Sequence, residues 1–435
     1  MLKTLKIPTS DLSIGMYISG LDRPWLETPF ITQGFLIERP EDIRELQKYC
    51  ESVYIDSRRS SHPGTVVRRE SPPPQRRSEP PKRFERQPDE GSAKKLRERP
   101  RIPLSHIFLG RPLKPYRDDS KWEEEQPRAQ RMLTTLIGDI DDIFKHVSAG
   151  AKLDVIKLRK SIEPMVDSIS RNPDACLWVS RLKDHDQYTY HHALSAAMWA
   201  VSLGRQLGLP RRDLRSLAMG CMLMDIGMLR VDRSLLQAQR KLTTEETAEV
   251  ALHVSHGLDI LKECGILNQD VIDIVAHHHE RYDGSGYPAG LSRDQIPPFA
   301  RIAAIVDTYD AITSTRSYAK PVSPSDAIKL LYGLRDQDFQ AELVEAFIQA
   351  VGIYPAGTLV ELSSGEVGVV VAEYRTRRLR PKVMLLLDEQ KKQLPIAQVI
   401  DLQEFAAESG ASPLTIKTSL EPFSYGLDLA RVSGL

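Results

Sequence analysis

A helical apolar periodicity covers more than half of this 435-residue chain and most limits what it can fold into. From residue 126 to residue 352, apolar side chains recur at the 3.6-residue spacing of amphipathic helices, and no alternating strand pattern interrupts them. We therefore predict an all-helical domain over 126–352, near the upper size for a single core. The clearest helical stretches cover residues 153–169, 188–207, 211–224, 244–264, 270–279, 299–313 and 325–331.

Two smaller patterned segments flank this domain. Extended patterns surround one amphipathic stretch over 38–50, whose Pro40 suits a helix N-terminus, so we predict a small α+β domain over 1–57. After the helices the apolar period changes to two, which predicts a small β domain over 353–408. Its candidate strands cover residues 358–362, 367–373, 382–387 and 399–402. Residues 409–435 show little pattern and are interpreted as a tail. The predicted fold class is therefore mainly α.

Between the first two domains lies a segment rich in proline and arginine. Eleven of the 29 prolines fall between residues 62 and 115, and residues 58–101 carry 14 basic against 6 acidic side chains in a chain of zero net charge. Such a composition cannot bury enough apolar surface to fold, so we predict a disordered linker over 58–125, with 102–109 as a short docking patch. The positive charge could attract nucleic acid or an acidic partner. A run without interleaved aromatic residues favours a solvated tether, so we do not expect nucleic-acid binding.

The four cysteines lie far apart and form no Cys-x-x-Cys pair. This spacing indicates neither a disulfide framework nor a thiolate zinc site. No apolar run reaches the roughly 18 residues of a membrane helix, and the N-terminus lacks the pattern of a signal peptide. We therefore expect a cytoplasmic protein without stable membrane insertion.

Histidines and carboxylates concentrate in the helical stretch. Nine of the eleven histidines lie between residues 146 and 279, and Asp225 and Asp307 stand within apolar sequence, where a carboxylate is costly unless a cation compensates it. Imidazole and carboxylate without thiolate suit a hydrolytic iron, manganese or zinc centre. Neighbouring helical residues point about 100° apart, so His278 and His279 favour two adjacent metals over one. The alternative is that single residues are ordinary buried polar groups, and this applies most to His185, His191, His256 and His277.

Three motifs in residues 188–331 carry a resemblance to a known family. His-His-Glu is followed by Asp-Gly-Ser-Gly-Tyr-Pro-x-Gly-Leu and then by Ala-Arg-Ile-x-x-Ile-x-Asp-x-x-Asp-Ala. This order resembles the HD-GYP family of bacterial cyclic-di-GMP phosphodiesterases, a branch of the HD hydrolase superfamily. Residues 5–56 also resemble the small domain that often precedes HD-GYP. The resemblance implies a helical fold with a metal centre, typically iron or manganese, that cleaves the cyclic dinucleotide to pGpG or GMP.

The resemblance also implies roles for individual residues. Asp225 would bridge two metals and, with His192, form the catalytic centre. Tyr188 stands where some members have an extra glutamate, which favours one or two divalent metals over three. The implied metal ligands are His192, Asp225, His253, His278, His279 and Asp307. The implied residues for substrate or partner binding are Asp283, Gly284, Gly286, Tyr287, Pro288, Arg316 and Tyr318.

Three positions depart from the family pattern. Met224 and Met228 replace the histidine and lysine of His-Asp-Ile-Gly-Lys, and Ala319 replaces a second cation. A thioether is a poor ligand for a hard hydrolytic metal, so we expect reduced phosphodiesterase activity. The alternative is a non-catalytic module that binds cyclic-di-GMP or a GGDEF-type diguanylate cyclase as a receptor or regulator. A different phosphoester substrate is a third reading. Family members can pair through helices, so a homodimer is compatible with the resemblance.

Overall fold

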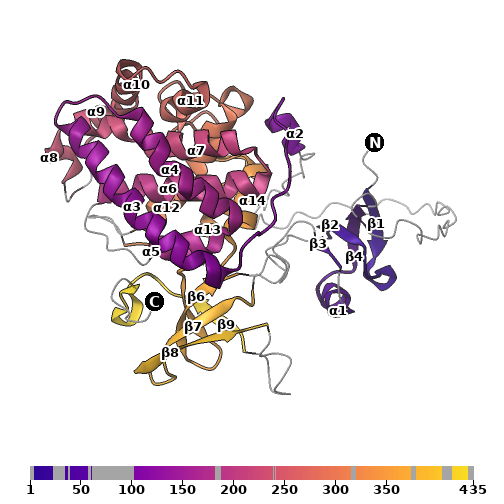
Figure 1. Cartoon of the computed structure of the whole chain (residues 1–435). Coiled ribbons are helices and arrows are strands. Elements are labelled where there is room, and N and C mark those ends of the chain that lie inside the picture. The colour runs from indigo at the N-terminus through magenta and orange to yellow at the C-terminus, as the bar shows by residue number, and fades with distance from the viewer. Residues whose placement is uncertain are drawn as a thin grey trace, which may run out of the picture. The chain divides into compact units, whose positions relative to one another are not determined.

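The structure of the chain is a computed structural model. It describes residues 4–22, 35–37, 40–56, 60, 102–181, 188–238, 240, 242–314, 320–373, 379–403 and 414–429. Chain contacts divide it into two compact units, coloured mainly indigo and magenta-to-yellow in Figure 1. The N-terminal unit comprises Met1–Thr28 and Gln33–Ile102, and the main unit comprises Pro29–Thr32 and Pro103–Leu435. No helix in the described part of the chain is long and apolar enough to cross a membrane.

In its described residues, the N-terminal unit is a four-stranded antiparallel sheet with one α-helix, which confirms the predicted α+β class. The strand order is β1-β4-β2-β3. Its elements are β1 (Thr4–Pro8), β2 (Tyr17–Leu21), β3 (Phe35–Leu36), α1 (Pro40–Tyr49) and β4 (Ser52–Asp56). Leu46 of α1 and Ile18, Val53 and Ile55 of the sheet are buried, so the unit has an apolar core of its own.

The main unit is a bundle of helices, as the periodicity predicted. Its helices are α2 (Leu104–Ile107), α3 (Trp122–Ser148), α4 (Val155–Arg171), α5 (Pro173–Arg181), α6 (Tyr188–Leu207), α7 (Arg211–Leu223), α8 (Arg233–Leu236), α9 (Thr244–Ala251), α10 (His253–Glu263), α11 (Gln269–His277), α12 (Pro298–Thr313), α13 (Pro324–Gly333) and α14 (Ala341–Val351). Helix α6 contacts α4, α7, α12 and α14 and is labelled in the middle of the bundle in Figure 1. Its buried Trp199 has its ring centroid 5.2 Å from Tyr309 and 6.4 Å from Phe347. These aromatic rings join α6, α12 and α14 into one core.

The segment before α3 lies along the bundle and is fixed to three of its helices. The guanidinium of Arg111 forms ion pairs with Asp213 of α7 at 2.8 Å and Asp270 of α11 at 2.6 Å. It also lies 4.4 Å from the ring centroid of Phe299 on α12. Phe108 is buried, with its ring 6.3 Å from the same phenylalanine. This segment therefore belongs to the main unit.

The predicted linker 58–125 is accordingly wrong at its C-terminal end. Residues from 103 onward fold with the helices, and α3 already begins at Trp122. The high proline content indicated disorder. Composition cannot show that a few isolated apolar and charged residues of this segment pack against the helices. The rest of the predicted linker, apart from Ser60 and Ile102, lies outside the described residues.

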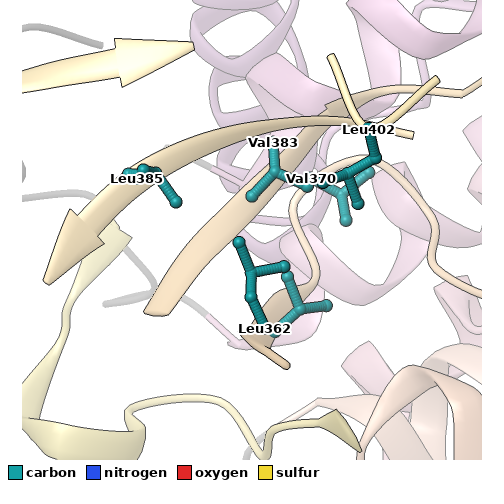
Figure 2. Close-up of a cluster of buried hydrophobic side chains, with 6 residues drawn as sticks. Leu362, Val370, Val383, Leu385 and Leu402 are labelled. Atoms are coloured by element: carbon teal, nitrogen blue, oxygen red, sulfur yellow. The ribbon is translucent and has the colours of Figure 1, made fainter. Parts of the chain in front are cut away.

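The C-terminal part of the main unit is a five-stranded antiparallel sheet of order β8-β7-β6-β5-β9. Its strands are β5 (Leu359–Leu362), β6 (Val367–Ala372), β7 (Lys382–Leu387), β8 (Gln393–Asp401) and β9 (Ile416–Ser419). Figure 2 shows its apolar cluster, which contains Leu362, Val370, Val383, Leu385 and Leu402. The predicted β module is confirmed. The interpretation of 409–435 as a tail is wrong for β9, which pairs with β5 and whose short, largely exposed sequence has no apolar alternation.

Candidate metal centre

A close crossing of two backbones positions Asp225. This residue follows the end of α7 and precedes the 3₁₀ helix η3 (Ile226–Arg230). A Cβ atom on Gly227 would lie 1.9 Å from the carbonyl oxygen of His253 and 2.5 Å from the amide nitrogen of Gly257. Only glycine permits this approach of η3 to α10. The glycine of the Met-Asp-Ile-Gly-Met motif thus brings Asp225 next to His253.

Three imidazoles and Asp225 form the first group of donors, here called the histidine group. One ligand atom each from Asp225, His253, His278 and His279 lies within 4.8 Å of the others. Oδ1 of Asp225 is 3.4 Å from Nε2 of His253 and 3.7 Å from Nε2 of His278. Nε2 of His279 is 3.2 Å from Nε2 of His253. His278 and His279 lie in the turn after α11, which ends at His277, and both belong to this one group. That they serve two adjacent metals stays a prediction.

A second group of donors, the aspartate group, uses the other oxygen of Asp225. Asp225, His192 and Asp307 each offer an atom within the same 4.8 Å limit. Nε2 of His192 on α6 lies 2.9 Å from Oδ1 of Asp307 on α12 and 3.7 Å from Oδ2 of Asp225. Asp225 therefore belongs to both groups. The structure thus brings together all six residues that the sequence predicted as metal ligands.

Hydrogen bonds on the outer nitrogens orient three of the four imidazoles. Nδ1 of His192 contacts Oδ2 of Asp310 at 2.8 Å, Nδ1 of His253 contacts the carbonyl of Val250 at 2.9 Å, and Nδ1 of His278 contacts the carbonyl of Ile274 at 3.1 Å. A carbonyl accepts only from a protonated nitrogen, so neutral His253 and His278 carry the proton on Nδ1 and direct the Nε2 lone pair inward. Convergent lone pairs beside two carboxylates fit a divalent cation.

The electrostatics of the centre separate its histidines into two kinds. Burial lowers the pKa of His253, and burial together with the charge of His278 lowers the pKa of His279 to about 3. Burial also opposes protonation of His192, but hydrogen bonds to Asp307 and Asp310 outweigh it and raise its pKa well above 6.5. The pKa of His278 is raised because Asp225 outweighs its burial. His253 and His279 are thus neutral donors near pH 7, whereas the neighbouring carboxylates favour the protonated forms of His192 and His278, with which a bound cation would compete.

The glycine-rich loop after His279 folds over the histidine group. Gly284 has a φ of +89°, which favours glycine, and the backbone amide of Ser285 donates to Asp283 at 2.9 Å. The ring of Tyr287 stacks on His279 with centroids 4.6 Å apart and an interplanar angle of 21°. The peptide bond from Tyr287 to Pro288 is cis. The loop predicted for substrate or partner binding therefore borders the metal centre.

Sequence reasoning assigned no role to two residues near the centre, of which Asp310 contacts it directly. Asp310 holds His192, and its other oxygen accepts the indole N–H of Trp199 at 3.3 Å. Its signal was present, because Asp307 and Asp310 lie three residues apart on one face of α12. Glu280 is buried and completes the His-His-Glu motif.

The remaining predicted positions divide into described and undescribed residues. Met224 is fully buried at the end of α7, and Met228 is partly buried in η3. Arg316, Tyr318 and Ala319 lie outside the described residues, as does His185. His256 and His277 belong to neither group of donors, and the side chain of His191 is outside the description.

Three family models match the chain in order. They are a domain of unknown function (DUF3391) over residues 4–158, an HD domain over 178–343 and a KOW domain associated with the HD domain over 359–406. The first match extends from the N-terminal unit through α3. The second contains every residue of both groups of donors, and the third lies on the C-terminal sheet.

Curated relatives match the chain over different lengths. A cyclic di-GMP phosphodiesterase of Pseudomonas aeruginosa is 32% identical over 405 residues, which is 92% of this chain and 89% of that protein. A 3′3′-cGAMP-specific phosphodiesterase of Vibrio cholerae is 33% identical over 36% of this chain and 30% of its own length. Among solved structures, an HDG"Y"P protein of Bdellovibrio bacteriovorus matches with a TM-score of 0.44 and 15% identity, over 79% of this chain and 98% of that one.

Proposed function

Because the chain belongs to the HD-GYP family of HD-domain proteins, we propose that it is a metal-dependent phosphodiesterase that hydrolyses cyclic-di-GMP to pGpG or GMP. The observation that carries this proposal is that Asp225 belongs to two groups of donors, in each of which the ligand atoms lie within 4.8 Å of one another. A carboxylate that faces two sets of ligands suits a pair of metals on one phosphodiester. The relative from Pseudomonas aeruginosa, similar over 92% of the chain, supports the choice of substrate.

The residues of the chain would divide the work as follows. Asp225 offers Oδ1 to the histidine group and Oδ2 to His192. Asp310 holds the His192 ring through Nδ1, so that Nε2 stays directed at the centre. Bound divalent metals would polarise the phosphate and lower the pKa of a coordinated water. The imidazole and carboxylate donors favour iron or manganese, with zinc as an alternative, in one or two sites.

We further propose that the activity is reduced. Met224 takes the position of a histidine that would add a nitrogen donor to the aspartate group, which leaves that group with three protein ligands. Met228 removes a cation, and each lost charge-assisted contact to phosphate costs about 1.5–3 kcal/mol. The histidine group keeps four donors and is therefore the stronger metal site.

The methionine at position 224 also favours a second candidate function. With one weakened metal site, the domain could bind cyclic-di-GMP as a receptor, or contact a GGDEF-type diguanylate cyclase, without hydrolysis. The loop that ends at Leu291 would supply this contact, because its Tyr287 residue is 38% exposed. A homodimer formed through helices remains a prediction of the family resemblance.

The deciding experiment is a turnover assay on full-length protein reconstituted with Mn²⁺ or Fe²⁺. Cyclic-di-GMP and 3′3′-cGAMP are supplied separately, products are separated by chromatography, and binding is titrated in parallel with Asp225→Ala as control. Formation of pGpG or GMP that disappears in the control supports the phosphodiesterase. Binding without product supports the receptor. Faster cleavage of 3′3′-cGAMP would overturn the choice of substrate.

A further inference from the structure

We propose that Glu280 is a positioning residue: it holds Tyr287 against His279 and thereby orients the His279 imidazole toward the metal centre. The proposal deepens the proposed function, and it rests on that function only for the role of His279 as a metal ligand. Four observations lead to it, namely the burial of Glu280, its two backbone partners, the course of the loop and the ring stack.

The buried carboxylate of Glu280 binds backbone amides of the loop. The residue is 1% exposed, and each oxygen accepts one backbone N–H, Oε1 from Ala289 at 2.8 Å and Oε2 from Leu291 at 3.0 Å. Both donors lie on the far side of the loop, nine and eleven residues along the chain. Charge-assisted bonds to a buried carboxylate are the strong kind, so they fix the returning half of the loop relative to the turn that carries His279.

The outgoing half of the loop lies directly on the same turn. A Cβ atom on Gly286 would be 2.3 Å from the amide nitrogen of Arg281 and 2.5 Å from Cα of Glu280. The amide of Tyr287 donates to the carbonyl of His279 at 3.3 Å. The loop therefore doubles back over the His-His-Glu turn. Tyr287 lies between two fixed points of this loop: Gly286, which packs on the turn, and the backbone amides that Glu280 binds.

His279 depends on this arrangement more than the other histidines do. His192, His253 and His278 are each oriented by a hydrogen bond on Nδ1. Within the part of the chain that the structure describes, Nδ1 of His279 has no such bond, and the stacked ring of Tyr287 is what lies against its imidazole. Contacts that orient a ligating imidazole change metal affinity about 10–100-fold when removed.

The test measures Co²⁺ affinity on metal-free, full-length protein, with the visible spectrum of bound Co²⁺ as the readout of ligand geometry. Four variants are compared with the wild type: Glu280→Gln, Tyr287→Ala, Tyr287→Phe and the double variant Glu280→Gln with Tyr287→Ala. Gln295→Ala is the matched control, because Gln295 accepts the backbone amide of Ser292 at 3.1 Å just beyond the loop without touching Glu280's partners. The melting temperature of each metal-free variant is recorded.

We expect Glu280→Gln and Tyr287→Ala each to weaken Co²⁺ binding about tenfold or more and to change its spectrum. Tyr287→Phe keeps the ring and should keep both properties, as should the control. The double variant should lose no more than Tyr287→Ala alone, because both residues act through one stack.

A purely structural role for Glu280 would lower the melting temperature and leave Co²⁺ affinity and spectrum at wild-type values, which would overturn the proposal. Additive losses in the double variant would overturn it as well. If the variants lose Co²⁺ affinity while the wild type hydrolyses no cyclic dinucleotide, the positioning role stands and the proposed function fails.

Discussion

Asp225 couples the two groups of donors at the scale of one residue. Its oxygens face different partners, with Oδ1 3.4 Å from His253 and Oδ2 3.7 Å from His192. Opposite charges and hydrogen bonds hold its pKa below the usual value against the effect of burial, so it stays an anionic donor near pH 7. A metal bound by one group would therefore change the position and the charge of the Asp225 carboxylate that the other group also uses.

The histidine group should govern metal content. Replacing His278 and His279 by alanine removes two of its four donors, and we expect bound transition metal to fall from about one equivalent to a small fraction of that. Metal analysis of protein purified without chelator measures this. His256→Ala is the matched control, since His256 lies on α10 beside His253 but outside both groups. Undiminished metal in the double variant would sink the ligand assignment.

Restoring the family residues at positions 224 and 228 should raise turnover. Met224→His with Met228→Lys adds a nitrogen donor to the aspartate group and a cation for phosphate, so we expect kcat for cyclic-di-GMP to increase at least about tenfold. Met224→Leu preserves the volume of this fully buried side chain and should not raise kcat. An unchanged rate in the restored variant, in protein of normal stability, would mean that the pocket differs from active members elsewhere.

The six candidate metal ligands could be proposed from sequence because they stand in motifs that resemble those of a known family, whereas the sequence assigns no role to the residues that support them. Asp310 acts on His192 across 118 positions of sequence, and only the packing of α12 on α6 joins them. Glu280 stood in a quoted motif, but its partners are backbone amides, which any residue type supplies. Sequence patterns report side-chain identity and say little about such backbone partners.

At the scale of elements, one buried carboxylate joins α3 to α4. Glu125 of α3 is fully buried and accepts from Nε of Arg171 at 2.9 Å and from the hydroxyl of Ser168 at 2.9 Å, both on α4. Burial alone would raise its pKa, but these donors outweigh burial and lower the pKa below 4.5. The ionised form therefore stabilises the packing of the two helices.

This carboxylate predicts a pH-dependent part of stability. Because its folded pKa is depressed, its contribution is complete above the unfolded value of about 4.5 and is lost as pH falls below that value toward the folded pKa. We expect Glu125→Gln to lower the free energy of unfolding by about 2 kcal/mol at pH 6.5, and by less near pH 3.5. Hydrogen bonds to charged groups contribute about 1.5–3 kcal/mol, and the lower part of that range applies because Arg171 is partly exposed. Urea unfolding at both pH values measures this.

Glu124→Gln, one position earlier and exposed, is the control for that measurement and should change stability little at either pH. An equal loss for Glu125→Gln at both pH values would contradict the pairing as the source of the effect.

Elements with a continuous apolar stripe could be predicted closely from sequence. The predicted stretch 188–207 coincides with α6, and 367–373 differs from β6 by one residue. The predicted docking patch 102–109 does pack on the bundle through Phe108. The rest of the segment before α3 and strand β9 could not be predicted, because their stability comes from partners elsewhere. Arg111 needs Asp213 and Asp270, and β9 needs the edge of β5. The sequence pattern of an element is weak wherever contacts with other parts of the chain supply most of its stability.

At the scale of the whole molecule, the two units have separate apolar cores. Units with their own cores unfold independently, so we expect two transitions in calorimetry of the full-length protein. Saturating Mn²⁺ should raise the melting temperature of the main unit only, because every candidate ligand lies in that unit. A single transition that shifts as a whole would show that the units unfold together.

The position of β9 determines how the chain can be shortened for experiments. The KOW match ends at residue 406, which invites truncation there. Such a truncation would remove the strand that covers β5 and would leave the amides and carbonyls of Val360 and its neighbours as an open sheet edge. Open edges recruit strands from other molecules, so the shortened protein would tend to aggregate. A low yield from it would then report a missing strand and say nothing about the stability of the metal centre.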